Sequence, residues 1–427
     1  MGLSVTGSSG QPAVLAIDGG NSKTDVALIA ADGMVLASLR GPGASQEDYG
    51  IDGAMRILGG LVREVTAQAG AAVDGPVARH LSACLAGCDL PSEEESLTAA
   101  LRAQGWSATA VAMNDTFAVL RAGLPDAGAT MSGVAVTCGA GINCVAVSPE
   151  GRTFRYLALG ELTGDWGGGW GLAKAIMWHA MRGSDGRGPE TGLGASVAAH
   201  FGLASVSDVT VAIHQGRLGE TDLVAMAPPV LFQVAATGDG VALRLVARQA
   251  QEVCVMAVTA MRQLGMNTAG TEIVLGGGLL QAGDPLLSRE LEVSFAMDAP
   301  GAIIRVASVP PIAGAALLGL DHLGVSVAAK ERLRQSFATG ASGTRGAGEL
   351  SVSPFARIVF AWRRDFIVCD EISTACKKSS GWRVTPEGVY DRSPRLVSPR
   401  DAQRTGFTAR AAPVTPPQRG EPRRPGS

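Results

Sequence analysis

The segment VLAIDGGNSKTDVALIAADGMVLAS, from Val14 to Ser38, decides the fold of this chain. It reads as an apolar strand, a bend spelled Asp18-Gly19-Gly20-Asn21-Ser22, a second strand, a tight Asp-Gly turn and a third strand. Glycine weakens strands and gives a core no side chain, but it lets the backbone approach another group closely. The segment therefore predicts a hairpin-led sheet whose first bend meets a ligand.

The composition of this bend suits a phosphate group. Gly19 and Gly20 allow backbone N–H groups to converge on an anion. Polar groups follow them at Asn21, Ser22, Lys23 and Thr24, although Lys23 also fits a position that only faces solvent. Asp18 ends its strand beside the anion, where a carboxylate needs a cation between them, and Mg²⁺ commonly bridges a carboxylate and substrate phosphates. No Gly-Lys-Ser/Thr run opens a helix here, so the bend is not a Walker A loop.

The same pattern returns 120 residues later in GVAVTCGAGINCVAVSPEGRTFRY, residues 133–156, with a glycine bend at 139–141. In the first copy we expect strands at 13–18, 24–30, 34–39, 77–86 and 108–113, and helices at 50–69, 93–104 and 115–123. In the second we expect further strands at 272–275 and 302–306, and helices at 168–183, 190–201, 207–214, 239–265 and 312–323. The order βββαβαβα is therefore predicted twice, with helices inserted in the second copy.

Two such copies predict two α/β domains that face each other across a cleft, a preferred place for a small molecule. We place the first domain at residues 1–124, the second at 125–327 and a tail at 328–427. Glycine bends in hairpins also occur without a function. Two bends at matching places in a repeat favour a functional explanation.

The composition supports a globular protein with real cores, since 46% of its 427 residues are hydrophobic. A formal net charge of −3 predicts no general affinity for nucleic acid. The N-terminus lacks a secretory pattern, and its Met-Gly-x-x-x-Ser/Thr match to a myristoylation signal is frequent by chance. The longest apolar runs, such as 312–320, are about half a membrane span. We expect a soluble cytoplasmic protein with no membrane partner.

The seven cysteines are scattered, which favours buried thiols in a reducing compartment. Cys84 and Cys88 are close in sequence, but without a second pair a zinc site is not expected.

The tail differs in charge from the rest of the chain. Residues 330–427 hold 18 Lys/Arg and 9 Asp/Glu, and the Pro/Arg/Gly-rich end lacks an apolar period. This composition predicts a largely disordered appendage. Contact with nucleic acid or acidic lipid is the alternative, but aromatic residues do not alternate with the basic ones.

Asp115 has two interpretations. It follows the predicted strand at 108–113 and opens a helix, so a helix-capping role is the ordinary explanation. A carboxylate at the end of a strand inside a cleft can also accept the proton of an attacking hydroxyl. The two roles can coexist.

Five segments in order resemble the N-acetylglucosamine kinase and BadF/BadG/BcrA/BcrD-type ATPase family, within the sugar kinase/Hsp70/actin superfamily. They are the first bend, Met113–Thr116, Thr137–Asn143, Gly160–Gly169 and Ile273–Leu279. The resemblance covers about residues 13–325 and implies two ribonuclease H-like (actin-like ATPase) domains. It implies that ATP and Mg²⁺ are used to phosphorylate a sugar.

The resemblance also assigns residues to roles. It implies that Asp115 is the catalytic base, that Asp18 holds the metal, and that Gly139, Ala140, Gly141, Gly276, Gly277 and Gly278 join the first bend in binding ATP. The sugar-binding positions correspond to Ser45, Asn114, Asp115, Gly160 and Asp165. Ser45 stands where an Asn is typical, Ala140 where a hydroxyl is usual, and Trp166 where an acid is common. Glycines 167–169 also fit a flexible connection.

The activity we expect is phosphorylation of an amino sugar, N-acetylglucosamine or glucosamine, at O6. One alternative is an ATPase that activates a partner reductase or dehydratase, a branch that needs an iron–sulfur cluster. Its cysteine-containing helical element is absent from the sequence. Another is a non-catalytic sugar-binding regulator, but no helix-turn-helix pattern precedes Val14. The oligomeric state stays open, with a homodimer as one alternative.

Overall fold

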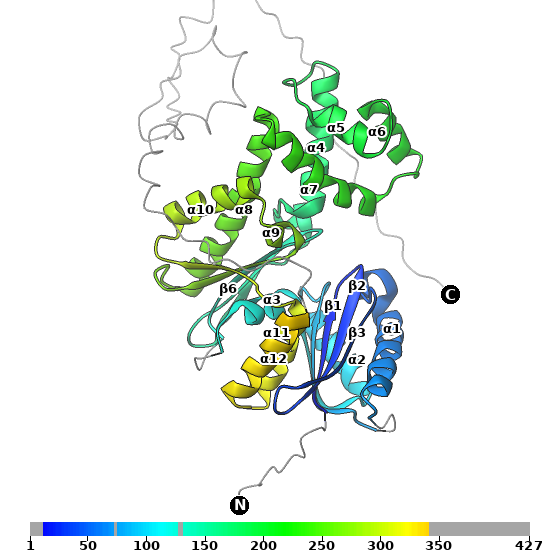
Figure 1. The fold of residues 1–427 in the computed structure, drawn as a ribbon, viewed down its shortest axis with the longest axis vertical. Helices are drawn as coiled ribbons and strands as arrows, with labels where there is room; N and C mark the ends of the chain where they lie inside the picture. Colours follow the sequence, from blue (N-terminus) through cyan, green and yellow to red (C-terminus); the bar gives the residue numbers. More distant parts are fainter. Residues whose placement is uncertain (1–11, 72–74, 127–130, 341–427) are drawn as a thin grey trace, which may run out of the picture. The chain divides into compact units, whose positions relative to one another are not determined.

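The computed structural model describes residues 12–71, 75–126 and 131–340 (Figure 1). The first half forms one five-stranded sheet with the strand order β3-β2-β1-β4-β5. Its elements are β1 (Pro12–Gly19), β2 (Lys23–Ala30), β3 (Val35–Pro42), α1 (Gln46–Gln68), β4 (Ala78–Leu85), α2 (Pro91–Ala103), β5 (Ser107–Asn114) and α3 (Thr116–Gly123). β1 pairs antiparallel with β2 and parallel with β4, which pairs parallel with β5.

The second half forms a second sheet with the order β10-β9-β6-β7-β8. It begins with β6 (Gly133–Cys138), β7 (Ile142–Val147), β8 (Thr153–Arg155), the 3₁₀ turn η1 (Gly160–Thr163), α4 (Gly168–Ser184), α5 (Leu193–His200), α6 (Val206–His214), α7 (Glu220–Ala236) and α8 (Gly240–Leu264). It continues with β9 (Glu272–Gly276), α9 (Gly278–Gln281), α10 (Pro285–Asp298), β10 (Ile303–Val306), α11 (Pro311–His322) and α12 (Val327–Gly340).

The two sheets repeat one topology. Three antiparallel strands are followed in each by two strands that extend the sheet in parallel from its first strand. The predicted duplication of βββαβαβα is therefore confirmed, with the inserted helices between β8 and β9. β1 and β2 are buried almost throughout because helices cover both faces of the sheet, whereas the edge strand β3 alternates with exposed positions.

The two halves exchange helices across the sheets. α11 packs on β1 and β4 of the first sheet, where Ile312 and Leu317 join the core around Val14 and Ile29. α3 packs on the second sheet, where Val119 and Leu120 join a core with strand residues of β6, β7 and β9. α3 and α11 also lie side by side (Figure 1). Each sheet is therefore completed by a helix from the other half of the sequence.

Four helices fall outside the residue ranges that we expected to be helical, namely α7, α9, α10 and α12. α7 contains Pro228 and Pro229, which a sequence pattern treats as breakers because proline lacks an N–H donor. α10 begins at Pro285 after the capping residue Asp284. α12 overlaps the segment that we assigned to the tail from residue 328. The packed chain therefore continues to Gly340, and residues 341–427 of the predicted tail lie outside the described residues.

α12 is fixed by packing and by charge. Leu333 is fully buried, and the Arg334 guanidinium binds the Asp126 carboxylate at 2.6 Å. It also donates to the backbone carbonyls of Arg121, Ala122 and Leu124 at the end of α3. Within the described ranges, no helix combines the length and apolar character needed to cross a membrane.

Candidate active site

The first bend is closed by its own backbone and braced by the loop after β3. The Gly20 N–H donates to the Lys23 carbonyl at 2.8 Å, and the Ala44 N–H donates to the Gly20 carbonyl at 3.3 Å. Asn21, Ser22 and Lys23 are exposed at the tip. Thr24 is fully buried, and its hydroxyl has no hydrogen-bond partner among the described residues. The bend thus presents backbone and short polar side chains to solvent.

The second bend is held by the first turn of α4. The Gly169 and Trp170 N–H groups donate to the carbonyls of Gly139 and Ala140 at 2.9 and 2.8 Å. Gly168 has φ +65°, and a Cβ there would lie 2.3 Å from the Gly141 carbonyl oxygen. The glycine run at 167–169 is therefore a close backbone contact, which explains it better than a flexible connection. Residues 139–141 themselves remain exposed.

The third glycine motif lies against the second. Gly276 pairs with Thr137 across the sheet. Gly277 has φ +83°, and a Cβ at this position would lie only 2.3 Å from the Cys138 carbonyl oxygen. Buried Gln249 of α8 ties these parts together, since it accepts the Gly168 N–H at 3.0 Å and donates to Cys138 Sγ at 3.6 Å. Sequence reasoning missed Gln249, although a glutamine inside an apolar helical stripe is a signal.

Asp115 begins α3 but does not cap it. Its side chain makes no capping hydrogen bond, whereas Asn114 Oδ1 accepts the Thr116 N–H at 2.9 Å. The capping explanation of Asp115 is therefore wrong, and Asn114 serves that purpose. The Asp115 carboxylate accepts a hydrogen bond from the Thr116 hydroxyl at 3.4 Å. Burial raises the pKa of Asp115, and the hydrogen bonds from Thr116 oppose that rise.

Asp18, at the end of β1, lies near Asp115. Burial, then the charges of Asp115 and Asp25, raise the pKa of Asp18 to about 8, while Lys23 and Arg40 oppose this. Asp25 is itself bound by Arg40 through two hydrogen bonds of 2.7 and 2.9 Å. Two neighbouring desolvated carboxylates form a place where a cation is favourable. The described residues contain no group of three acidic, histidine or cysteine ligands, so a bound Mg²⁺ would also need water and phosphate oxygens.

A set of hydrogen bonds joins the strand ends of the two sheets, and we call it the interlobe network. Asp89, in the loop between β4 and α2, accepts from Asn114 Nδ2 at 2.7 Å and from Asn143 Nδ2 at 3.4 Å. Asn143 Nδ2 lies 3.4 Å from Asn114 Oδ1, and the hydroxyls of Thr116 and Thr137 lie 3.3 Å apart. The sequence did not single out Asp89. Asn143 was quoted only as the last residue of a motif.

The other predicted sugar-side residues are engaged locally. Ser45 is buried, and its hydroxyl caps α1 by accepting the Glu47 N–H at 3.1 Å, so the structure gives it a capping role. Asp165 accepts the Thr163 hydroxyl at 2.6 Å and donates its N–H to the Gly160 carbonyl at 3.1 Å. Gly160 and Asp165 are thus brought together in one tight loop before α4.

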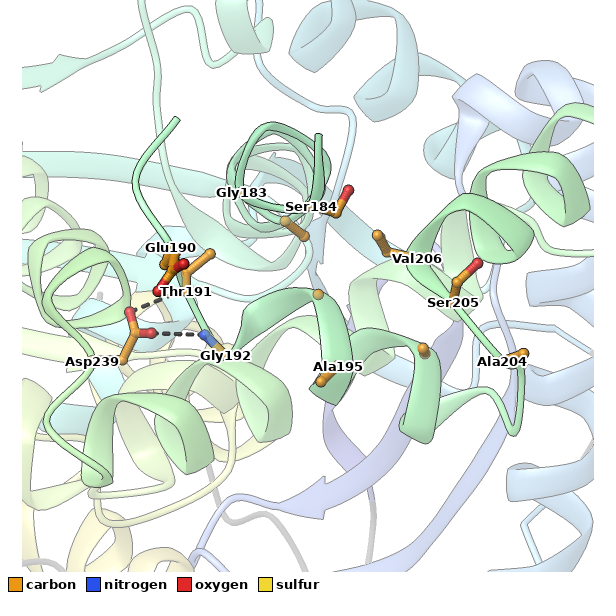
Figure 2. Close-up of a pocket in the computed structure, with 13 residues that line it drawn as sticks. Gly183, Ser184, Glu190, Thr191, Gly192, Ala195, Ala204, Ser205, Val206 and Asp239 are labelled. Atoms are coloured by element: carbon orange, nitrogen blue, oxygen red, sulfur yellow. Dashed lines mark hydrogen bonds between the residues drawn. The ribbon is translucent and has the colours of Figure 1, made fainter. Parts of the chain in front are cut away.

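The described cavities lie away from these residues. One of about 600 Å³ lies among α4, α5 and α6, lined mainly by small side chains (Figure 2). Asp239 at its edge is satisfied by the Thr191 hydroxyl and the Gly192 N–H at 3.1 and 2.8 Å (Figure 2). A second, of about 590 Å³, lies at the start of β9. Neither contains a predicted site residue.

Comparisons with known proteins agree with this architecture. The N-acetyl-D-glucosamine kinase of Dictyostelium discoideum is 23% identical over 72% of this chain and 97% of its own length. The N-acetylmuramic acid/N-acetylglucosamine kinase of Clostridium acetobutylicum is 24% identical over 62% of this chain and 85% of its own.

Solved structures share the fold. A candidate N-acetylglucosamine kinase from Chromobacterium violaceum superposes with a TM-score of 0.57 at 21% identity, covering 73% of this chain and 99% of its own. Its counterpart from Porphyromonas gingivalis gives 0.52 at 19% identity, covering 73% and 100%. The model of one protein family matches residues 15–319, which include all three glycine motifs and Asp115. The chain belongs to the BadF/BadG/BcrA/BcrD ATPase family.

Proposed function

We propose that this protein is an ATP-dependent kinase that phosphorylates an amino sugar, N-acetylglucosamine in the first place, at O6. Membership of an ATPase family implies that ATP is the nucleotide. Two relatives that act on N-acetylglucosamine match most of their own length to this chain, which supports the choice of sugar. The single observation that carries the proposal is Asp115, a carboxylate at a strand end that is not used to cap its helix.

We assign Asp115 as the base that accepts the proton of the attacking sugar hydroxyl. Phosphoryl transfer needs mainly positioning and charge neutralisation, with one group that orients the nucleophile. The raised pKa of Asp115 makes it a better proton acceptor than an ordinary exposed carboxylate. Asn114, whose amide is fixed by the Thr116 N–H, is assigned to the sugar together with Gly160 and Asp165.

The phosphates are assigned to the two bends. Gly19, Gly20, Asn21, Ser22 and Lys23 would bind them from the first sheet. The residues from the second sheet would be Gly139, Ala140, Gly141, Gly276, Gly277 and Gly278. Residues 21–23 and 139–141 are exposed, and glycine-rich bends of this kind suit anion binding. Asp18 is assigned to Mg²⁺, which when bound supplies charge neutralisation to the phosphates.

The test is an ADP-release assay on the full chain with N-acetylglucosamine, glucosamine, N-acetylmuramic acid and glucose. We expect the highest kcat/KM with N-acetylglucosamine and a product whose phosphate is on O6 by ³¹P–¹H NMR. Omitting Mg²⁺ with a chelator is the matched control. ATP hydrolysis that no sugar stimulates would contradict the proposal and favour the partner-activating ATPase.

A further inference from the structure

We propose that Asp89 is a positioning residue: it orients the Asn114 amide beside Asp115 and couples that orientation to Asn143 of the second sheet. This inference rests on the proposed function and names a residue that neither the glycine motifs nor the acidic strand ends include. Its evidence is the pattern of donors and acceptors in the interlobe network.

The orientation of both amides follows from their other bonds. Asn114 Oδ1 accepts the Thr116 N–H at 2.9 Å, so Asn114 Nδ2 must point to Asp89. Asn143 Oδ1 accepts the Cys144 N–H at 2.7 Å, so Asn143 Nδ2 likewise faces Asp89. Two donors therefore converge on one carboxylate oxygen. One carboxylate oxygen, with its two lone pairs, accepts from both amides.

Asp89 is poorly placed for a purely stabilising ion pair. Its neighbour Arg155 is bound instead by Glu94, through contacts of 2.8 and 3.0 Å. Asp89 is half-buried, and burial followed by the charge of Asp115 raises its pKa to about 7. A carboxylate held near another carboxylate, with amides as its partners, is arranged for orientation more than for stability.

The position of Asn114 matters because Asp115 follows it directly. An amide rotated away from Asp89 would release Nδ2 and disturb the end of β5, where the sugar hydroxyl must meet the base. Misplacement of about 1 Å is enough to reduce the rate about a hundredfold. Asn143 belongs to the second sheet. The Asp89 oxygen that accepts from Asn114 and Asn143 therefore links the orientation of Asn114 to the position of the second sheet.

The test is Asp89→Ala in the full chain. The methyl group removes the oxygen that accepts from both amides, so the convergence on one oxygen is lost. We expect kcat/KM for N-acetylglucosamine to fall about 10- to 100-fold. The KM for ATP should stay near wild type, and so should the thermal midpoint. A general structural defect would change all three quantities together.

Glu94→Gln is the matched control, since Glu94 lies in the same segment and also contacts the second sheet. It should leave kcat/KM for the sugar near wild type. The proposal is overturned if Asp89→Ala keeps the wild-type sugar kcat/KM, if it changes the ATP and sugar parameters equally, or if Glu94→Gln has the same effect.

Calorimetry of sugar binding distinguishes a failure of the proposed function from a failure of this inference alone. A wild-type chain that neither binds nor turns over any sugar defeats the proposed function, and this inference with it. A wild-type chain that is active, together with an Asp89→Ala variant of unaltered kcat/KM, defeats the inference alone.

Discussion

The two copies of the repeat have one topology but different chemistry at their strand ends. In the first copy, carboxylates stand at or just after the ends of three strands, at Asp18, Asp89 and Asp115. In the second copy, the corresponding strands β6 and β9 end in Cys138 and Gly276, and Ala307 and Ser308 follow β10. In the proposed site, the first copy therefore contributes charge and the second contributes backbone.

The copies also differ in what supports their bends. The first bend is braced by a short loop at Ala44, whereas the second is braced by the first turn of an inserted helix. One helix, α1, connects the third and fourth strands of the first sheet. Helices α4 to α8 occupy the same place in the second. The insertion therefore contributes to the candidate site through its first residues.

The sharpest test of the comparison replaces the acid that follows β5 in the first copy and an exposed residue that follows the corresponding strand β10 in the second. Asp115→Asn should reduce turnover with sugar by about 10²–10⁴, the usual contribution of a positioned base. The thermal midpoint should change little, because the Asp115 side chain does not cap α3. Ser308→Ala, at an exposed position two residues after β10, should leave turnover near wild type. Steady-state rates that are equal for both variants would refute the division between copies.

A second test concerns α12, which has no counterpart after α3 in the first copy. Leu333→Ala should reduce the free energy of unfolding by about 2–5 kcal/mol, because it removes a fully buried side chain. Val327→Ala, at a position 43% exposed, is the control. Urea unfolding of both variants measures the difference. A small loss at Leu333 would show that the repeat is complete without α12.

Truncation addresses the same helix. We expect a chain that ends at Gly340 to keep the wild-type midpoint in urea. Ending the chain before Lys330, inside the tail that we expected from residue 328, removes Leu333 and Arg334 from their contacts with the core and α3 and should lower that midpoint.

A third test asks whether the second bend depends on its bracing helix. Gly168→Ala forces a Cβ against the Gly141 carbonyl, which should cost about 1–3 kcal/mol beyond the cost of its positive φ. Gly186→Ala has φ +79° with nothing near the added Cβ, so it should show only the conformational cost of about 1–2 kcal/mol. ATP affinity should fall in the first variant alone. Equal losses of stability in the two variants would mean that the contact between residue 168 and the Gly141 carbonyl adds no strain.

The smallest expected effect is a pH dependence where the two halves meet. His80 of β4 stacks on His322 of α11 with ring centroids 4.0 Å apart, and it bonds the Thr109 hydroxyl at 2.9 Å. Burial and the neighbouring His322 lower the pKa of His80 to about 4. The unfolded chain therefore binds more protons between about pH 4 and 6.5, and stability falls as pH falls through that range.

His80→Gln should flatten the slope of the thermal midpoint against pH in this range. His200→Gln, on the exposed surface of α5, should leave the slope unchanged. Equal slopes in wild type and His80→Gln would show that the stacked pair does not couple folding to protons.

Much of this architecture could be read from the sequence, because strands and amphipathic helices leave local periodic signals. The bend at Gly19 and its echo at Gly139 located both hairpins. The roles of Asn114 and Ser45 could not be read, because a capping bond depends on which of two neighbouring side chains turns toward the helix. Asp89 was missed for a related reason: its partners are distant in sequence. The helix that contains Leu333 was missed because the chain becomes basic near residue 330, and we took that change in charge as the start of a disordered tail.

The exchange of helices between the halves has a consequence for the timing of synthesis. The ribosome makes β1 to β5 early, but the apolar face around Val14 and Ile29 waits for α11, about 200 residues after β5. At ordinary translation speeds that interval is roughly 10–40 s. During it, the nascent first sheet presents an uncovered hydrophobic surface, which is a binding site for chaperones and a risk of aggregation. The first half of the chain is thus made early and finished late.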